Sequence, residues 1–191
     1  MSKLLKSATP NDYMDVVENS LGPTEQDLYS VVPLIFNLPP GAYIVGGCAR
    51  WLLDSRWPSK KDIDIIFGDY ESMMTWIEKW GNDSFYTQNA YGSLSLRYDL
   101  IYNTSEFDYI QCWKHNTTLK TYLDNVPTNL DGIACRFNPL TSKFDFEFAD
   151  DFFDGFIERT HPNVYLLRGA QNHIMRQKGQ YESVKKIWTV T

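Results

Sequence analysis

The sequence has few cysteines and histidines, and their spacing excludes several common kinds of site. The three cysteines, Cys48, Cys112 and Cys135, are an odd number and widely separated, so they predict no disulfide framework. Neither they nor the three histidines have the spacing of zinc ligands. A phosphate-binding Walker A motif and a serine nucleophile elbow are also absent. Scattered free cysteines are typical of the reducing cytoplasm, where we expect this protein to be.

Long apolar runs are missing as well, and so is an excess of basic residues. No apolar run approaches membrane-spanning length, and the N-terminus lacks the apolar core of a signal peptide, so no membrane contact is expected. The formal net charge of −6 argues against a surface coated with phosphate contacts but allows a local basic groove. The chain is instead 43% apolar and 15% aromatic over 191 residues. That content excludes disorder and predicts one domain with an appendage.

The segment from Ala42 to Phe67 carries the pattern with the clearest chemical content. It predicts a short apolar strand at Tyr43–Val45, a turn at Gly46-Gly47 and a helix over Cys48–Leu53. A basic loop that contains proline follows, and a second strand is expected at Asp62–Phe67.

Two carboxylates of the second strand are expected to share one face. Side chains two residues apart on a strand point the same way, so Asp62 and Asp64 project together while Ile63 and Ile65 pack behind them. Two neighbouring carboxylates repel each other unless a cation lies between them. Mg²⁺ prefers a few carboxylates together with substrate phosphates. The strand therefore predicts a magnesium site.

The turn before the helix has the features of an anion site. Gly46 and Gly47 let the backbone approach a ligand closely, and the helix that follows presents free N–H groups to an anion. Arg50, one helical turn later, can add a charged fork to phosphate oxygens. We therefore expect a phosphate-holding turn beside the pair of carboxylates.

This arrangement resembles the head domain of class II tRNA nucleotidyltransferases and bacterial poly(A) polymerases, within the DNA polymerase β-like superfamily. Those proteins carry G-G-x-x-R-D-x-L and then D-x-D on a strand. The matching residues are Gly46, Gly47, Arg50, Leu52, Asp62 and Asp64. Trp51 stands where the family has an aspartate. The resemblance implies an α/β (α+β) fold with a mixed, mostly antiparallel sheet and helices packed on it.

The resemblance also implies site residues beyond this segment. The third catalytic acid of the superfamily corresponds to Asp108, with Glu106 as the competing candidate. Lys61, or its neighbour Lys60, is expected to assist with the phosphates. Asp131 matches an aspartate that helps hold the sugar of the nucleotide, or it caps a turn.

At two positions near Asp131 the chain departs from the family. Asn129 and Leu130 occupy places where the family has two arginines. Because of these departures, the way in which this chain would hold a nucleotide sugar stays open.

Hydrophobic periodicity predicts the other elements. Strands are expected at 84–88, 93–102, 107–113, 133–137 and 143–148, and helices at 69–80 and within 116–125. A last helix, capped by Asn163, is expected to bury Ile174 and to carry His173, Arg176 and Lys178 on its other side. The expected organisation is an arm at 1–22, a head domain at 23–162, and a C-terminal helix and tail at 163–191.

Two functions follow from the resemblance. The first is a nucleotidyltransferase that uses two Mg²⁺ or Mn²⁺ ions and an NTP such as ATP, with an RNA 3′ end, a protein or a small hydroxyl compound as acceptor. The second is a non-catalytic adaptor or inhibitor that binds a protein or RNA partner. The family's neck, body and tail domains have no counterpart here, so a stand-alone, divergent head domain is expected.

Overall fold

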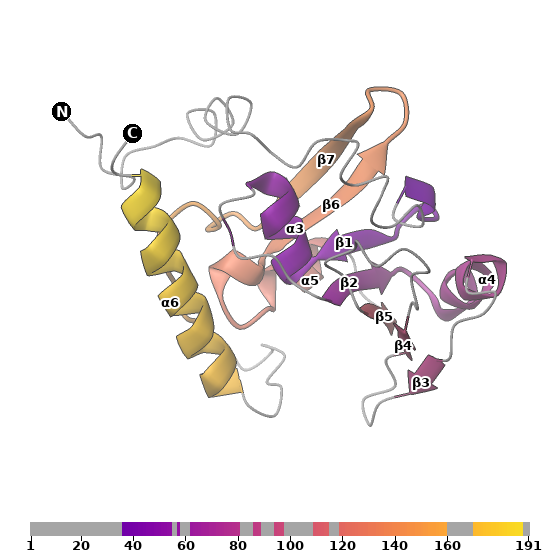
Figure 1. Ribbon diagram of the computed structural model, residues 1–191, viewed down its shortest axis with the longest axis horizontal. Coiled ribbons are helices and arrows are strands. Elements are labelled where there is room, and N and C mark those ends of the chain that lie inside the picture. Colours follow the sequence, from indigo (N-terminus) through magenta and orange to yellow (C-terminus); the bar gives the residue numbers. More distant parts are fainter. Residues whose placement is uncertain are drawn as a thin grey trace.

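One mixed sheet organises the part of the chain that the structure describes (Figure 1). This structure is a computed structural model, and it describes residues 36–54, 57, 62–80, 86–88, 94–97, 109–114, 119–159 and 170–188. The described strands form a seven-stranded sheet in the order β3-β4-β5-β2-β1-β6-β7. They are β1 (Tyr43–Val45), β2 (Asp62–Phe67), β3 (Tyr86–Gln88), β4 (Leu94–Arg97), β5 (Tyr109–Lys114), β6 (Ile133–Asn138) and β7 (Lys143–Phe148).

The direction of the strands agrees with the expected sheet. β2 and β5 run parallel, and each of the other described strand pairs is antiparallel. The predicted mixed, mostly antiparallel sheet is therefore confirmed. Each strand that the periodicity predicts has a counterpart, and β4 lies within the expected range 93–102. The expected arm at 1–22 and the boundary at 162–163 lie outside the described residues.

Helices pack on both faces of this sheet. α3 (Gly46–Leu53) and α4 (Tyr70–Trp80) contribute to the main core on one face, against Ile63, Ile65 and Ile133. α5 (Leu119–Asp124) contributes Leu123 to a second cluster, on the face that carries Val45, Ile66 and Ala134. Alternation along β2 explains the two cores, because successive residues of a strand point to opposite faces.

The amphipathic helix expected at 69–80 is α4. Asp69 lies just before it and accepts hydrogen bonds from the backbone N–H of Ser72 at 2.7 Å and from the Ser72 hydroxyl at 2.8 Å. These contacts satisfy part of the helix start and lower the pKa of Asp69. Met73, Trp76 and Ile77 are buried, as the stripe predicts.

α6 (Ala170–Trp188) lies beside the sheet rather than on it (Figure 1). Its Tyr181 and Val184 pack against Trp57 and Leu130 in a third, smaller apolar cluster. The helix therefore contacts the loops that follow α3 and α5. Within the described ranges, each helix is too short or too polar to cross a lipid bilayer.

Asn129 fastens the loop at 151–157 to the short 3₁₀ turn Asn129–Asp131. Its side chain is fully buried and donates to the carbonyl oxygens of Asp151 and Gly155, both at 2.8 Å. It also accepts from the N–H of Ile157 at 2.9 Å. One amide side chain thus satisfies several backbone groups of this loop.

Replacing Asn129 with alanine is expected to destabilise the protein strongly. The change leaves buried backbone groups unpaired, so we expect the free energy of unfolding to fall by about 2–4 kcal/mol. Urea denaturation measures the change, with Asn172→Ala on the exposed side of α6 as the control. Similar unfolding midpoints for the two variants would contradict this role.

Candidate active site at the turn between β1 and α3

The glycine turn lies directly beside one of the predicted carboxylates. Val45 of β1 pairs with Asp64 of β2, and the chain turns into α3 at Gly46, whose φ is +66°. A Cβ atom added to Gly46 would lie 3.4 Å from Oδ2 of Asp64. Only glycine adopts this φ without strain, and its missing side chain leaves space above the carboxylate.

Alternation along β2 places Asp64 on the face opposite the main core. Ile63 and Ile65 are fully buried, whereas Asp64 is half-buried. Asp62 occupies the position two residues earlier in β2, which by the pleat belongs to the same face as Asp64. The structure describes the backbone of Asp62 but not its side chain.

The start of α3 has the properties of an anion site. Its N-cap, Val45, makes no side-chain cap hydrogen bond, and the first turn of the helix contains no acidic residue. Gly46 and Gly47 are half-buried at this end. The N–H groups at a helix start and the helix dipole attract negative charge, so a phosphate group beside Asp64 would be stabilised, most effectively with a cation between them.

Gly46→Ala is expected to damage this site more than it damages the fold. A positive φ costs a residue with a Cβ about 1–2 kcal/mol, and the methyl group would contact the Asp64 carboxylate. Gly41→Ala is a matched control, because Gly41 has a φ of +80° and nothing within 4 Å of an added Cβ. We expect similar losses of stability in thermal unfolding but weaker Mg²⁺-dependent nucleotide binding only in Gly46→Ala. Equal nucleotide affinities would contradict the role of the turn.

The donor set suits a magnesium ion in part. Asp64 provides a carboxylate beside a cradle that a Cβ would fill, and Asp62 occupies the adjacent position of its face. Within the described residues, no three His, Cys, Asp or Glu side chains gather closely enough to form a metal site. The predicted third acid, Asp108, and its competitor, Glu106, lie outside those residues.

The register of β5 shows which residues lie beside the two aspartates. Tyr109 pairs with Asp62, and Gln111 pairs with Asp64, in parallel register. Paired residues of neighbouring strands belong to the same face of a sheet. The described part of β5 therefore places an aromatic residue and an amide, not a carboxylate, at these two positions.

Arg50 is buried inside the protein. Its side chain is 2% exposed, and Nη1 donates to the carbonyl oxygen of Leu130 at 2.6 Å and to Oδ1 of Asp131 at 3.0 Å. The guanidinium carbon lies 5.8 Å from the centre of the Trp57 ring. The structure thus brings Arg50 and Asp131 together, and direct contact of either with a nucleotide stays a prediction. Lys61 and Lys60 lie outside the described residues.

Asp131 is the centre of a buried polar network. Besides Arg50, it contacts Thr128, whose hydroxyl donates to Oδ2 at 2.8 Å, and His173, whose Nε2 lies 2.8 Å from the same oxygen. Burial acts to raise the pKa of Asp131, but the hydrogen bond from His173 and the charge of Arg50 outweigh it and lower the pKa to about 2. The contact with Thr128 joins two side chains of the same short turn, and both roles expected of Asp131 stay predictions.

His173 does not lie on the outer side of the last helix, and that expectation was wrong. Its side chain is 28% exposed and contacts Asp131. The buried side chains of α6 are those of Ile174, Gln177, Tyr181 and Val184. Compared with the predicted buried face, the observed buried face of the helix is therefore rotated toward His173. The spacing of His173, Gln177 and Tyr181 at i, i+4 and i+8 is the signal that would have revealed this.

Trp51 of α3 has a packing role. It is half-buried and packs against the main apolar core. Held by this contact and by Arg50, α3 is fixed on two sides.

Comparisons with known proteins extend these observations. No model of a known protein family matches the chain, and a search of curated proteins finds no match. Among solved structures, similarity extends to a tRNA-processing enzyme in an apo form, with 15% identity, a TM-score of 0.50, and 77% of this chain and 43% of that chain covered.

Two further solved structures have TM-scores slightly lower than that. A tRNA nucleotidyltransferase in complex with a primer tRNA and an incoming ATP analogue has 17% identity and a TM-score of 0.49, with 77% of this chain and 46% of that chain covered. The Thermotoga maritima CCA-adding enzyme in complex with tRNA has 14% identity and a TM-score of 0.45, with 85% and 34% covered. This chain thus spans less than half the length of each of the three solved chains. The sheet order, the turn and the structural match together show that the chain has the polymerase β-like nucleotidyltransferase fold.

Proposed function

We propose that this chain is a metal-dependent nucleotidyltransferase that moves a nucleoside monophosphate from an NTP to an acceptor hydroxyl. The observation that supports the proposal most is that the Gly46 turn lies beside the Asp64 carboxylate. A Cβ atom added to Gly46 would lie 3.4 Å from an oxygen of that carboxylate. An anion-attracting helix start and a cation-attracting carboxylate therefore adjoin each other. A triphosphate with bound Mg²⁺ has the charges that fit such a pair.

The two glycines of the turn and the two aspartates of β2 have roles in the proposal. Asp62 and Asp64 would hold two Mg²⁺ or Mn²⁺ ions, together with a third acid, Asp108 or Glu106. When bound, such ions neutralise the charge of the triphosphate and lower the pKa of the attacking hydroxyl. The N–H groups at Gly46 would bind the β- and γ-phosphates.

Phosphoryl transfer at this site needs mainly alignment and charge stabilisation. The acceptor oxygen would attack the α-phosphorus in line, and the bond from that phosphorus to the bridging oxygen would break. Pyrophosphate would leave, and the hydroxyl proton would pass to solvent. Gly47 and Lys61 would orient the leaving group, since both are expected near the β- and γ-phosphates.

Arg50 and Asp131 enter the proposal through the position of α3. Arg50 is buried against Leu130 and Asp131, so it would hold α3, and with it the turn, at a fixed distance from β2. Asp131 in turn would position Arg50. Both residues would then affect nucleotide binding without touching the phosphates.

The acceptor in this proposal is an RNA (tRNA-like) 3′ end. The sequence resemblance favours it, and one of the similar structures is a tRNA-processing enzyme. The chain covers only 43% of that protein, so the full activity of that protein is not assigned to this chain. The choice of NTP, a protein partner and a cytoplasmic location stay predictions.

An adaptor or inhibitor without catalysis is the second candidate, and one observation favours it. Arg50 is committed to Asp131 and Leu130 inside the protein. Such a protein would keep the fold and bind a protein or RNA partner.

Nucleotide transfer to RNA distinguishes the two candidates. The protein is incubated with Mg²⁺, each labelled NTP in turn and total RNA, beside the Asp62→Ala/Asp64→Ala variant. Transfer and pyrophosphate release that disappear in the variant support the enzyme. Absence of transfer, of pyrophosphate release and of Mg²⁺-dependent NTP binding in the unaltered protein would instead support the adaptor.

A further inference from the structure

We propose that His173 of α6 is a positioning residue that couples this helix to the nucleotide-binding turn through Asp131 and Arg50. The inference rests on the proposed function of that turn. Two contacts connect the elements: His173 to Asp131 at 2.8 Å, and Asp131 to Arg50 at 3.0 Å. From Arg50, the chain itself leads back to Gly46 within α3. His173, Asp131 and Arg50 together form what we term the relay.

The neighbour of His173 on α6 determines which ring nitrogen carries the proton. Nη2 of Arg176 lies 3.2 Å from Nδ1 of His173. A guanidinium only donates hydrogen bonds, so Nδ1 accepts and the proton is assigned to Nε2. Nε2 then donates to Oδ2 of Asp131. In this tautomer His173 gives Asp131 a hydrogen bond directed from α6.

Both oxygens of Asp131 are engaged, and they are engaged from different elements. Oδ1 accepts from Arg50 of α3, whereas Oδ2 accepts from Thr128 and from His173 of α6. The carboxylate is therefore held from two sides, and its orientation determines where the guanidinium can lie. Without His173, one side of Asp131 keeps only the hydroxyl of Thr128.

The position of Arg50 matters for the turn because α3 is short. Gly46–Leu53 has 8 residues, and Arg50 lies one turn after Gly46. A shift of the guanidinium moves the helix and thus the N–H groups at its start relative to Asp64. Because catalysis and binding of a triphosphate depend on sub-ångström alignment, such a shift weakens binding without unfolding the protein.

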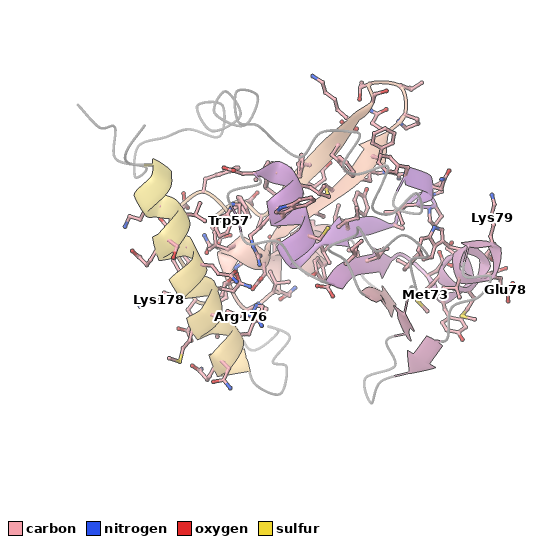
Figure 2. The ribbon with its side chains drawn as sticks, viewed as in Figure 1. Trp57, Met73, Glu78, Lys79, Arg176 and Lys178 are labelled. Atoms are coloured by element: carbon pink, nitrogen blue, oxygen red, sulfur yellow. The ribbon has the colours of Figure 1, made fainter. Side chains whose placement is uncertain are left out.

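Apolar contacts keep α6 in place independently of the relay. Tyr181 and Val184 of α6 pack against Trp57 and Leu130. Figure 2 shows that Trp57 lies between α3 and α6, with Arg176 on the side of α6 toward the rest of the chain and Lys178 on the outer side. Removing the imidazole is therefore expected to leave α6 docked, so a loss of alignment can be measured apart from a loss of the helix.

Substitutions at His173 separate its two hydrogen bonds. His173→Gln places an amide N–H near the position of Nε2 and keeps the donor to Asp131. His173→Asn places its amide near Nδ1 and keeps a partner for Arg176 only. His173→Ala removes both contacts, and Arg176→Ala removes only the contact between Arg176 and His173. The full chain is used throughout.

Two measurements test the relay: affinity for Mg²⁺ with a fluorescent ATP analogue, and backbone amide exchange in α3. We expect His173→Ala and His173→Asn to weaken the affinity by about tenfold and to speed exchange at residues 50–53. His173→Gln and Arg176→Ala should stay near the unaltered protein in both.

The outcomes separate this inference from the proposed function. The relay is disproved if His173→Gln behaves like His173→Ala. It is also disproved if backbone amide exchange in α3 is unchanged in both of these variants. If the unaltered protein binds no nucleotide, the proposed function fails, and amide exchange alone then decides whether the relay holds α3.

Discussion

Replacing Asp64 with asparagine is expected to abolish Mg²⁺-dependent nucleotide transfer while the protein stays folded. Asparagine has nearly the same shape as aspartate, so contact with the Gly46 turn is kept and only the negative charge is lost. A divalent cation contributes several kcal/mol of charge stabilisation to phosphoryl transfer, which corresponds to a loss of about 10³-fold or more. Pyrophosphate release measures the rate, and thermal unfolding verifies the fold.

Asp69→Asn is the matched control for this experiment. Asp69 is an exposed acid at the start of α4, where it accepts hydrogen bonds from Ser72, and asparagine also caps helices well. The same chemical change there should leave the rate unaltered. If Asp64→Asn were as active as Asp69→Asn, the carboxylate beside the turn would have no part in the reaction.

Breaking the pair between Arg50 and Asp131 is expected to have the largest effect on stability. Their side chains are 2% and 8% exposed, so either substitution leaves the other buried charge without this partner. We expect Arg50→Met and Asp131→Leu each to lower the free energy of unfolding by about 3–5 kcal/mol. Chemical denaturation of the two variants measures this loss.

The double variant tests whether the two buried charges are coupled energetically. Arg50→Met/Asp131→Leu has no buried charge from this pair left unpaired, so it should lose much less than the sum of the single losses. Lys120→Met is a control, because Lys120 pairs with Asp124 and Asp150 on the surface and should matter little. Additive losses at Arg50 and Asp131 would show that their contact is not coupled energetically.

The same network predicts how stability depends on pH. Because the pKa of Asp131 falls from 3.8 to about 2 on folding, the unfolded chain takes up the proton first as the pH drops. The stability that the carboxylate contributes is complete above about pH 4 and is lost as the pH falls toward 2, by about 2–3 kcal/mol in all. Asp131→Asn should lack this part of the acid transition, which denaturation at several pH values measures.

The sequence predicted the local part of this site well, since short-range rules govern it. Alternation in β2 separates Asp64 from Ile63 and Ile65 irrespective of what packs above. A glycine pair between an apolar strand and a helix-like run favours a turn with a positive φ, as found at Gly46. The same local patterns predicted the β6–β7 hairpin and α4.

Other features were beyond prediction from the sequence because they depend on residues far apart. The partner of Arg50 lies 81 residues later in the chain, and the partner of Asp131 on α6 lies 42 residues later still. The rotation of α6 that turns His173 inward is set by the cluster around Trp57 and Leu130. No local pattern near Arg50 distinguishes an arginine that faces phosphate from one that faces a buried aspartate.

The sequence by itself therefore determined the strands, the glycine turn and the face that carries Asp64. Their periodicity and backbone preferences act over a few residues. Only the tertiary structure decided that Arg50 points into the interior and which residues surround it. The reason is physical: a buried charge needs a partner, and which partner it finds depends on how distant segments pack.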